Sequence, residues 1–98
     1  MGIFDYQQID DVIHSRIRLA IMSALIATEE IEFTALRSLL KATDGNLSAN
    51  LKKLEEAGYI QVKKEFISRK PVSSYSLTEE GKKAFSNYIE NLEKLIRK

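Results

Sequence analysis

The sequence predicts a single α+β domain that is mainly helical, and three observations lead to this fold class. Apolar residues recur at helical spacing in four segments, which is the pattern of helices that share one core. Between residues 59 and 77 the spacing changes to the alternation of a β-hairpin. The length of 98 residues suits one hydrophobic core.

The composition narrows the class of protein further. The chain has no cysteine, which excludes a disulfide framework, a thiolate metal site and a thiol nucleophile. The longest apolar run, LAIMSALIA, is too short to span a membrane, and the N-terminus lacks the basic and apolar regions of a signal peptide. We therefore expect a cytoplasmic protein with no membrane association and no cofactor.

The first helical segment is predicted over residues 9–27, either as one helix or as two with a bend near His14 and Ser15. The run EEIEF at 29–33 breaks the helical period and predicts a short strand. Thr34 is expected to cap a second helix that ends at Leu40 and turns its leucines inward. The inward positions of these two helices are Ile9, Val12, Ile13, Ile17, Ala20, Ile21, Ala24, Leu25, Leu36, Leu39 and Leu40.

The stretch TDGNLSANLKKLEEAGYI contains a third helix, predicted over residues 43–58. Thr43 can cap it by accepting a hydrogen bond from a free amide of the first turn, and Asp44 suits the positive end of the helix dipole. Gly58 can end it in a left-handed conformation. The buried stripe is Leu47, Leu51 and Leu54, with Ala42 and Leu47 placed to form a hydrophobic staple.

Residues 59–77 predict two strands, 59–67 and 72–77, with Ile60, Val62 and Phe66 on one face. The run SRKP separates them and places Arg69 and Lys70 at the hairpin tip. Thr78 then caps a last helix over residues 78–97, with apolar positions at Ala84, Phe85, Tyr88, Ile89, Leu92, Leu95 and Ile96. The order helix, short strand, helix, helix, hairpin, helix predicts one winged helix-turn-helix domain over residues 1–98.

The charge is unevenly distributed along the chain. Residues 1–40 carry three basic and six acidic side chains, whereas residues 41–70 carry seven basic and four acidic ones. The local excess coincides with the third helix and the hairpin. A basic region of this kind is typical of a surface that binds a polyanion such as DNA.

The outward face of the third helix predicts contacts with duplex DNA. The N-terminal half of a recognition helix enters the major groove, where large side chains would prevent close approach. Asparagine can pair with an adenine edge, serine with a base or a phosphate, and lysine with phosphates. The candidate residues are Asn46, Ser48, Asn50, Lys52 and Lys53. The alternative is an ordinary solvated helix face.

Arg69 and Lys70 suit a wing that touches the minor groove or the phosphate backbone. Their alternative role is to protect an exposed sheet edge from aggregation. His14 is the only histidine, so a shared metal site has little support, and no nucleophile with a base partner or phosphate-binding glycine loop is visible. The sequence therefore argues against an enzyme.

The first and last helices carry more apolar surface than a domain of this size readily buries. We expect that surface to form a homodimer interface, because two-fold symmetry sets half-site spacing in small DNA-binding proteins. The alternative is that the same residues close the core of a single chain. The candidate interface residues are Phe4, Tyr6, Ile9, Ile13, Tyr88, Leu92, Leu95 and Ile96.

The segments HSRIRLAIMSAL, FTALRSLL, TDGNLSANLKKLEEAGYI, KKEFISRKPVSSYSLTEEG and AFSNYI, in this order, resemble the MarR/ArsR-like winged-helix DNA-binding family, and most of all its small single-domain branch in archaea and bacteria. The resemblance covers about residues 14–90. It implies a homodimeric transcriptional regulator with a recognition helix at 43–58 and a wing at 59–77. By position it places DNA contacts on Thr43, Asn46, Ser48, Ala49, Asn50, Lys53, Arg69 and Lys70. The family often has proline at the position of Arg16 and histidine at that of Asn50.

The leading hypothesis is a dimeric repressor or regulator that binds double-stranded DNA with sequence preference. A second hypothesis is a winged helix that docks on proteins of a transcription assembly. A third is a regulator with an apolar effector pocket between dimer helices, although no residue identifies a small-molecule ligand. The target sequence and the direction of regulation do not follow from the residues.

Overall fold

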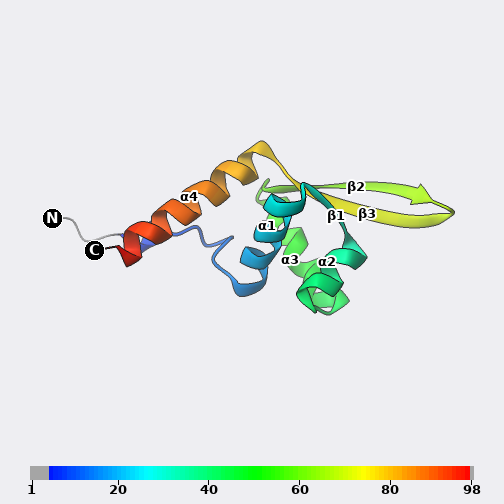
Figure 1. The fold of residues 1–98 in the computed structure, drawn as a ribbon, viewed down its shortest axis with the longest axis horizontal. Coiled ribbons are helices and arrows are strands. Elements are labelled where there is room, and N and C mark those ends of the chain that lie inside the picture. The colour runs from blue at the N-terminus through cyan, green and yellow to red at the C-terminus, as the bar shows by residue number, and fades with distance from the viewer. Residues whose placement is uncertain (1–4, 98) are drawn as a thin grey trace.

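The computed structural model describes residues 5–97. The helices and strands follow the predicted order, with a short 3-10 turn at Tyr6–Gln8 before them (Figure 1). The elements are α1 (Arg16–Thr28), β1 (Glu30–Glu32), α2 (Phe33–Leu40), α3 (Asp44–Glu56), β2 (Ile60–Ile67), β3 (Lys70–Leu77) and α4 (Glu79–Ile96). The predicted winged helix-turn-helix fold is confirmed.

The sheet has three antiparallel strands in the order β1-β3-β2. Tyr75 of β3 lies between Ile31 of β1 and Val62 of β2. Because β1 pairs only with residues 74–76, the outer half of the hairpin is a two-stranded ribbon. This ribbon extends away from the helices as the wing (Figure 1).

The core lies between α1, α2, α3 and the inner end of the sheet. The apolar stripes of α1 and α3 meet there, since helices with one apolar face stabilise each other by burying it. The buried apolar residues are Ile9, Ile13, Ile21, Met22, Leu25, Leu36, Leu47, Leu51, Leu54, Ile60, Leu77 and Tyr88. The leucine stripe predicted for the third helix is therefore confirmed.

The first helix begins later than predicted, at Arg16 instead of residue 9. Ser15 is its N-cap and accepts from the amide of Arg18, which leaves Arg16 at the first helical position, where proline is also favoured. Residues 9–15 form a turn in which Oδ1 of Asp10 accepts from the amides of Val12 and Ile13. Ile9 and Ile13 are buried as core residues, but they lie in this turn and not in a helix.

The second helix also differs from its prediction. It begins at Phe33, and its N-cap is Glu32, two residues before the predicted cap Thr34; the Glu32 side chain makes no capping hydrogen bond. Leu36 is buried and Leu40 is half-buried, but Leu39 is exposed, so the prediction that Leu39 faces inward is wrong. Helical spacing places Leu39 near the stripe, but no neighbouring element covers that side of α2.

The predicted ends of the third helix are confirmed. The Thr43 hydroxyl accepts from the amide of Asn46 at 3.1 Å, and Gly58 has a φ of 81° directly after the helix. Ala42, one residue before the cap, packs against the core that contains Leu47, as a hydrophobic staple requires. Lys41, with a φ of 53°, ends α2 and makes the turn into α3 sharp.

The hairpin turn consists of Ser68 and Arg69, which have φ values of 52° and 66°. Two successive residues of positive φ form the tight turn that suits the twist of a two-residue hairpin loop. Lys70 is the first residue of β3 and pairs with Ile67, so only Arg69 of the predicted pair lies in the turn itself. Phe66 shares a face with Val62 as predicted, but it is 78% exposed because the ribbon has left the core at this point.

The last helix begins after Thr78, whose hydroxyl accepts from the amide of Gly81 at 2.9 Å. Its first turn lies so close to the start of β2 that a Cβ on Gly81 would stand 1.9 Å from the Tyr59 carbonyl oxygen. α4 and the wing extend in opposite directions, which gives the molecule dimensions of 60 × 25 × 21 Å (Figure 1). Within residues 5–97, no helix combines the length and apolarity needed to cross a membrane.

Candidate nucleic-acid interface

The outward face of α3 is free of other segments of the chain. A Cβ atom added to Gly45 would meet no atom of another segment within 4 Å, so the space above the first turn of α3 is open. The surface of the N-terminal half of the helix therefore consists of short side chains that a partner can approach closely. The exposed residues of this face are Thr43, Asp44, Gly45, Asn46, Ser48, Ala49, Lys52 and Lys53.

An ion pair holds α2 and α3 together at the turn. Nη1 of Arg37 lies 2.5 Å from Oδ1 of Asp44, and both side chains are partly exposed. The pair neutralises the one carboxylate in the first turn of α3 and leaves the dipole of that helix without a free acidic neighbour. An anion at this end of α3 thus meets amide and hydroxyl groups with less repulsion.

Asn50 lies inside the protein and not on the predicted surface. It is only 8% exposed, and its Oδ1 accepts from Nη1 of Arg18 at 2.7 Å. Its Nδ2 donates to the main-chain oxygen of Asn46 at 2.8 Å and to Oδ1 of Asn46 at 3.0 Å. Both ends of the carboxamide are engaged, so Asn50 offers no free edge to a base, contrary to the prediction from sequence.

The two lysines of α3 form no ion pair within residues 5–97, although Lys53 lines a pocket together with Asp11 and Glu56. Lys52 and Lys53 are exposed, and in residues 5–97 neither forms an ion pair with Glu55 or Glu56. The ion pairs of this part of the chain lie elsewhere, at Arg37, Lys63 and Lys82. The two lysines are therefore available to a polyanion.

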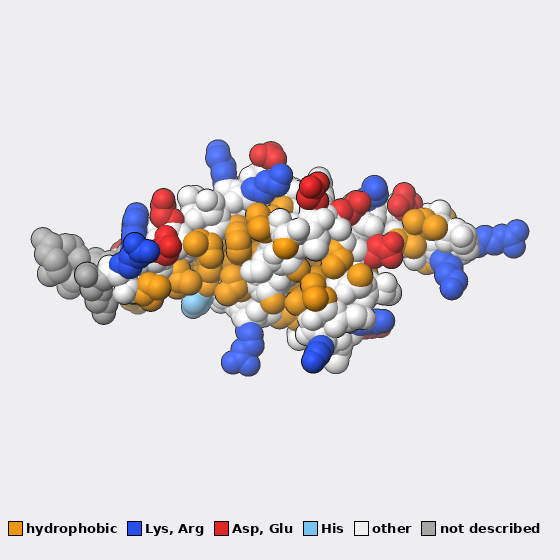
Figure 2. Space-filling view, in the orientation of Figure 1, with side chains coloured by type: hydrophobic (Ala, Val, Ile, Leu, Met, Phe, Trp, Pro, Cys, Tyr) orange, Lys and Arg blue, Asp and Glu red, His pale blue; other side chains and the backbone are white. Residues whose placement is uncertain are grey.

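The wing presents a second basic group at its far end. Arg69 and Lys70 are exposed on the turn and on the adjacent strand position, and Figure 2 shows basic side chains projecting from the end of the hairpin. Phe66 lies opposite Pro71 on the same ribbon, and both are exposed. The tip thus combines positive charge with a small apolar surface.

Two hydrogen bonds fasten the N-terminal turn to the rest of the domain. The Tyr59 hydroxyl donates to Oδ2 of Asp10 at 2.5 Å, and Nδ1 of His14 lies 2.9 Å from the Tyr88 hydroxyl. The bond to Asp10 raises the pKa of Tyr59 to about 12, and burial raises the pKa of Tyr88. Within residues 5–97 no cluster of three or more acidic or histidine residues is suited to a metal ion.

The residues predicted for the dimer interface fall into a buried group and an exposed group. Ile9, Ile13 and Tyr88 are buried within the single chain, because the N-terminal turn packs under α4, and they are not available to a second copy. Phe4 lies outside the described residues. The predicted residues that retain exposed surface are Tyr6, Leu92, Leu95 and Ile96.

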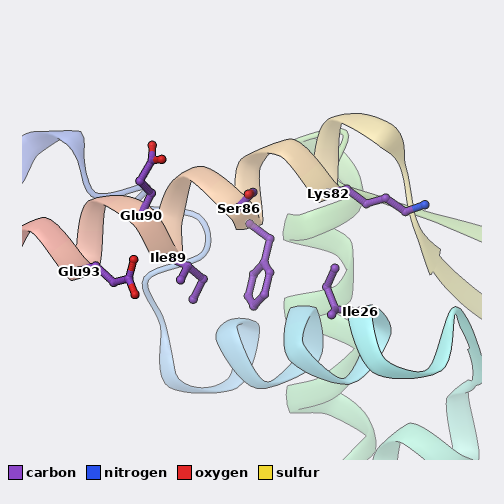
Figure 3. Close-up of a pocket in the computed structure, with 7 residues that line it drawn as sticks. Ile26, Lys82, Ser86, Ile89, Glu90 and Glu93 are labelled. Carbon is purple, nitrogen blue, oxygen red and sulfur yellow. The ribbon is translucent and has the colours of Figure 1, made fainter.

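A groove of about 490 Å³ runs between α4 and the end of α1. Figure 3 shows Ile26 of α1 and Ile89 of α4 directed into the space between the two helices, whereas Glu90 points away from it. Ile26 was not among the predicted interface residues. It belongs to the exposed side of α1, and only the position of α4 brings it beside Ile89.

Sequence reasoning also missed Arg18 and Arg37. The two arginines reach α3 from α1 and α2, across 32 and seven residues of chain respectively. No local pattern indicates such pairs, because the partner is fixed by how the helices pack. The one available signal was the charge of Arg18 beside the apolar residues Ile17 and Leu19 of the same helix.

Comparison with known proteins gives a consistent result. The sequence profile described as "winged helix DNA-binding domain" matches residues 17–96. An uncharacterized protein of Methanocaldococcus jannaschii is 40% identical over 78 residues, which cover 80% of this chain and 85% of that protein.

Solved structures agree with this match at the level of the fold. A transcriptional regulator homologue from Pyrococcus horikoshii OT3 superimposes with a TM-score of 0.83 at 23% identity, covering 92% of this chain and 90% of the other. The structure of MarR gives a TM-score of 0.76 at 16% identity over 94% of this chain and 66% of its own. At these identities the likeness establishes the fold alone.

Proposed function

The chain belongs to the family of winged helix DNA-binding domains, and from this premise we propose that it is a transcriptional regulator that binds double-stranded DNA with sequence preference. The observation that carries the proposal is the free outward face of α3, whose N-terminal half presents only short side chains. A helix with this character fits the major groove, where its first turns meet the base edges.

The proposed division of contacts follows the chemistry of each side chain. The Thr43 hydroxyl uses a lone pair to cap α3, so its hydrogen remains free to donate to a phosphate. Asn46 and Ser48 lie where they meet base edges, and Ala49 allows close approach or touches a thymine methyl group. Lys52 and Lys53, three and four residues after Ala49 and so about one helical turn further along, bind phosphates. Asn50 is left out of this set, because it is buried.

The wing is proposed to bind beside the recognition helix. Arg69 in the turn and Lys70 next to it carry charge for the minor groove or its phosphates. Free lysines on α3 and free basic groups on the wing support DNA over a protein partner, since an acidic or neutral face would be expected for docking. If Arg69 and Lys70 served only to protect the edge of the sheet from aggregation, basic groups would not be needed on α3.

We also propose that two copies associate through α4. The far half of this helix leaves Leu92, Leu95 and Ile96 with exposed surface, and the groove at Ile26 and Ile89 continues it toward α1. Exposed apolar side chains in a row along one helix are costly unless they are covered. A two-fold pair would present two copies of α3 to successive turns of the duplex, and we expect this dimer to act as a repressor in the cytoplasm.

The test is a fluorescence anisotropy titration with labelled duplexes across a salt series, followed by selection from random duplexes with the purified protein. We expect tight binding at low salt. For each phosphate contact, log K should fall by about 0.9 for every tenfold rise in salt concentration. The selected site should be a repeat with two-fold symmetry, and transcription from a promoter that contains it should fall when the protein is added. Absence of duplex binding at low salt would refute the proposal.

A further inference from the structure

Arg18 of α1 is connected to the recognition helix by a chain of hydrogen bonds. Its Nε donates to the main-chain oxygen of Val12, and its Nη1 donates to Oδ1 of Asn50. The guanidinium group thus donates to the N-terminal turn on one side and to α3 on the other, and so connects the two. Asn50 in turn donates to Asn46, which is exposed on the groove-facing side.

The partners on both sides fix the orientation of the Asn50 carboxamide. A guanidinium group only donates hydrogen bonds, so the atom of Asn50 that faces Arg18 at 2.7 Å must be the oxygen. A main-chain carbonyl only accepts, so the atom that faces the Asn46 carbonyl at 2.8 Å must be the nitrogen. A flipped Asn50 would lose both bonds in a site that is nearly closed to water.

The orientation of Asn46 follows from that of Asn50. The second hydrogen of Asn50 Nδ2 points to the Asn46 side chain at 3.0 Å, so the atom of Asn46 placed there is Oδ1. In the described part of the chain Nδ2 of Asn46 has no protein acceptor, and the residue is exposed. Asn46 therefore presents an N–H donor to the groove, while its Oδ1 is directed inward to Nδ2 of Asn50.

We propose that Arg18 is a positioning residue for base selection, which through Asn50 holds Asn46 as a hydrogen-bond donor. This inference rests on the proposed function, namely that α3 enters the major groove. It changes the expected partner of Asn46. The bidentate pairing of asparagine with adenine needs both an acceptor and a donor, whereas a donor alone selects acceptor edges such as O6 and N7 of guanine or O4 of thymine.

The decisive variant is Asn50→Asp. A carboxylate still accepts from Arg18, but it cannot donate to Asn46 and would repel both its Oδ1 and its main-chain oxygen. Asn46 then turns over, donates inward and presents its oxygen to the groove. Selection from random duplexes should show that the preference at one base position moves from an acceptor edge to a donor edge, such as N4 of cytosine or N6 of adenine.

Two substitutions of Arg18 separate positioning from packing. Arg18→Leu removes the donor and lets Asn50 flip, so the preference at the same position should fall by about five- to tenfold while other positions keep theirs. Arg18→Lys keeps one donor and should retain the preference. Asn46→Ala should remove the preference at that position in every background.

A measurement without DNA accompanies the selection. In the free protein, the side-chain NH2 signals of Asn50 in a nitrogen–proton spectrum should exchange slowly with water in the wild type and in Arg18→Lys, and rapidly in Arg18→Leu. Circular dichroism and urea unfolding identify any variant that fails to fold. If Arg18→Leu fails to fold, Asn50→Asp carries the comparison with the wild type, and if Asn50→Asp fails to fold, Arg18→Leu carries it.

The possible outcomes distinguish failure of the positioning role from failure of the proposed DNA binding. If the wild type binds no duplex, the proposed function fails first. If the wild type selects a site, but Asn50→Asp and Arg18→Leu lower its affinity for all sequences equally and change no base preference, DNA binding stands and the positioning role is overturned.

Discussion

The hydroxyl of Tyr59 donates a hydrogen bond to Oδ2 of Asp10 across 2.5 Å, and so joins the start of β2 to the N-terminal turn 49 residues earlier. Oδ1 of the same carboxylate accepts from two amides of that turn. One carboxylate thus organises the turn that buries Ile13 and lies against Arg18.

We expect the free energy of unfolding to fall above pH 10. The pKa of Tyr59 is raised from 10.0 to about 12, first by the bond to Asp10, so between these values the folded protein keeps a proton that the unfolded chain releases. The stability contributed by this tyrosine is therefore fully present below pH 10 and is lost as the pH rises toward 12. Tyr75 and Tyr88, whose pKa values are also raised, by burial, add to the slope. Urea unfolding at about pH 8 and pH 11 would measure it.

In Tyr59→Phe this pH dependence should be smaller but not absent. Tyr6→Phe is the matched control, since Tyr6 is exposed on the 3-10 turn. An equal alkaline slope in the wild type and in Tyr59→Phe would contradict the role given to the Asp10 bond.

Gly81→Ala should destabilise the fold by about 3 kcal/mol or more, at the upper end of the cost of overpacking. Its Cβ would stand 1.9 Å from the Tyr59 carbonyl oxygen, a main-chain atom that cannot move without displacing β2 or α4. Thermal and urea unfolding of the variant test this. Unchanged stability would mean that α4 does not rest on Tyr59 as described.

Gly45 gives the opposite expectation for stability. A Cβ there meets no atom within 4 Å, so Gly45→Ala should raise the free energy of unfolding by about 0.5–1 kcal/mol. Gly45→Phe should also fold, but it should weaken duplex binding by about tenfold or more, because a bulky side chain holds α3 away from base contacts worth about 1–3 kcal/mol each. Anisotropy titrations beside unfolding curves separate the two effects; equal binding by the wild type and Gly45→Phe would exclude this face from the groove.

Lys53→Ala and Arg69→Ala should each weaken binding to all duplexes by a similar factor. Each removes one proposed phosphate contact, so the slope of log K against log salt should become less steep by about 0.9. Lys83→Ala, an exposed lysine on α4, is the control and should leave the slope unchanged. A change in base preference without a change in slope would instead indicate a base contact.

Ile96→Asp should convert the proposed dimer into monomers in sedimentation equilibrium. Ile96 is 72% exposed at the end of α4, so the substitution should leave the unfolding of a single chain almost unchanged. Ile67→Asp, at an exposed isoleucine of the wing, is the matched control for added charge and should remain dimeric. A wild type that is monomeric at all concentrations would remove α4 from the dimer proposal.

Much of the fold could be predicted from local sequence, since caps act over a few residues. Thr43, Gly58 and Thr78 end or begin elements as their chemistry requires, and the alternation after Gly58 gave the hairpin. The spacing of apolar residues was less informative about whether another element covers a given face of a helix or strand. Leu39 and Phe66 have the expected spacing, yet both are exposed, because no element packs over them.

The candidate site could be predicted only in part for a related reason. The exposed positions on α3 follow from rotation around the helix, but the burial of Asn50 depends on Arg18, which is 32 residues away. Likewise, Ile9, Ile13 and Tyr88 meet each other only in the folded chain. Polar and apolar residues with partners distant in sequence cannot be assigned from spacing alone.

The anchoring of α4 limits how its length can vary among relatives. Its first turn rests on Tyr59, Tyr88 is buried beside His14, and Asn91 donates to the Gln8 carbonyl, while the last turn is exposed. Each helical residue adds about 100° of rotation and 1.5 Å of length. A single residue inserted after Asn91 would swing Leu95 and Ile96 about a quarter turn around the axis, whereas three or four inserted residues would return them to nearly the same side about 5 Å further out. Insertions and deletions at this end are therefore expected in whole turns.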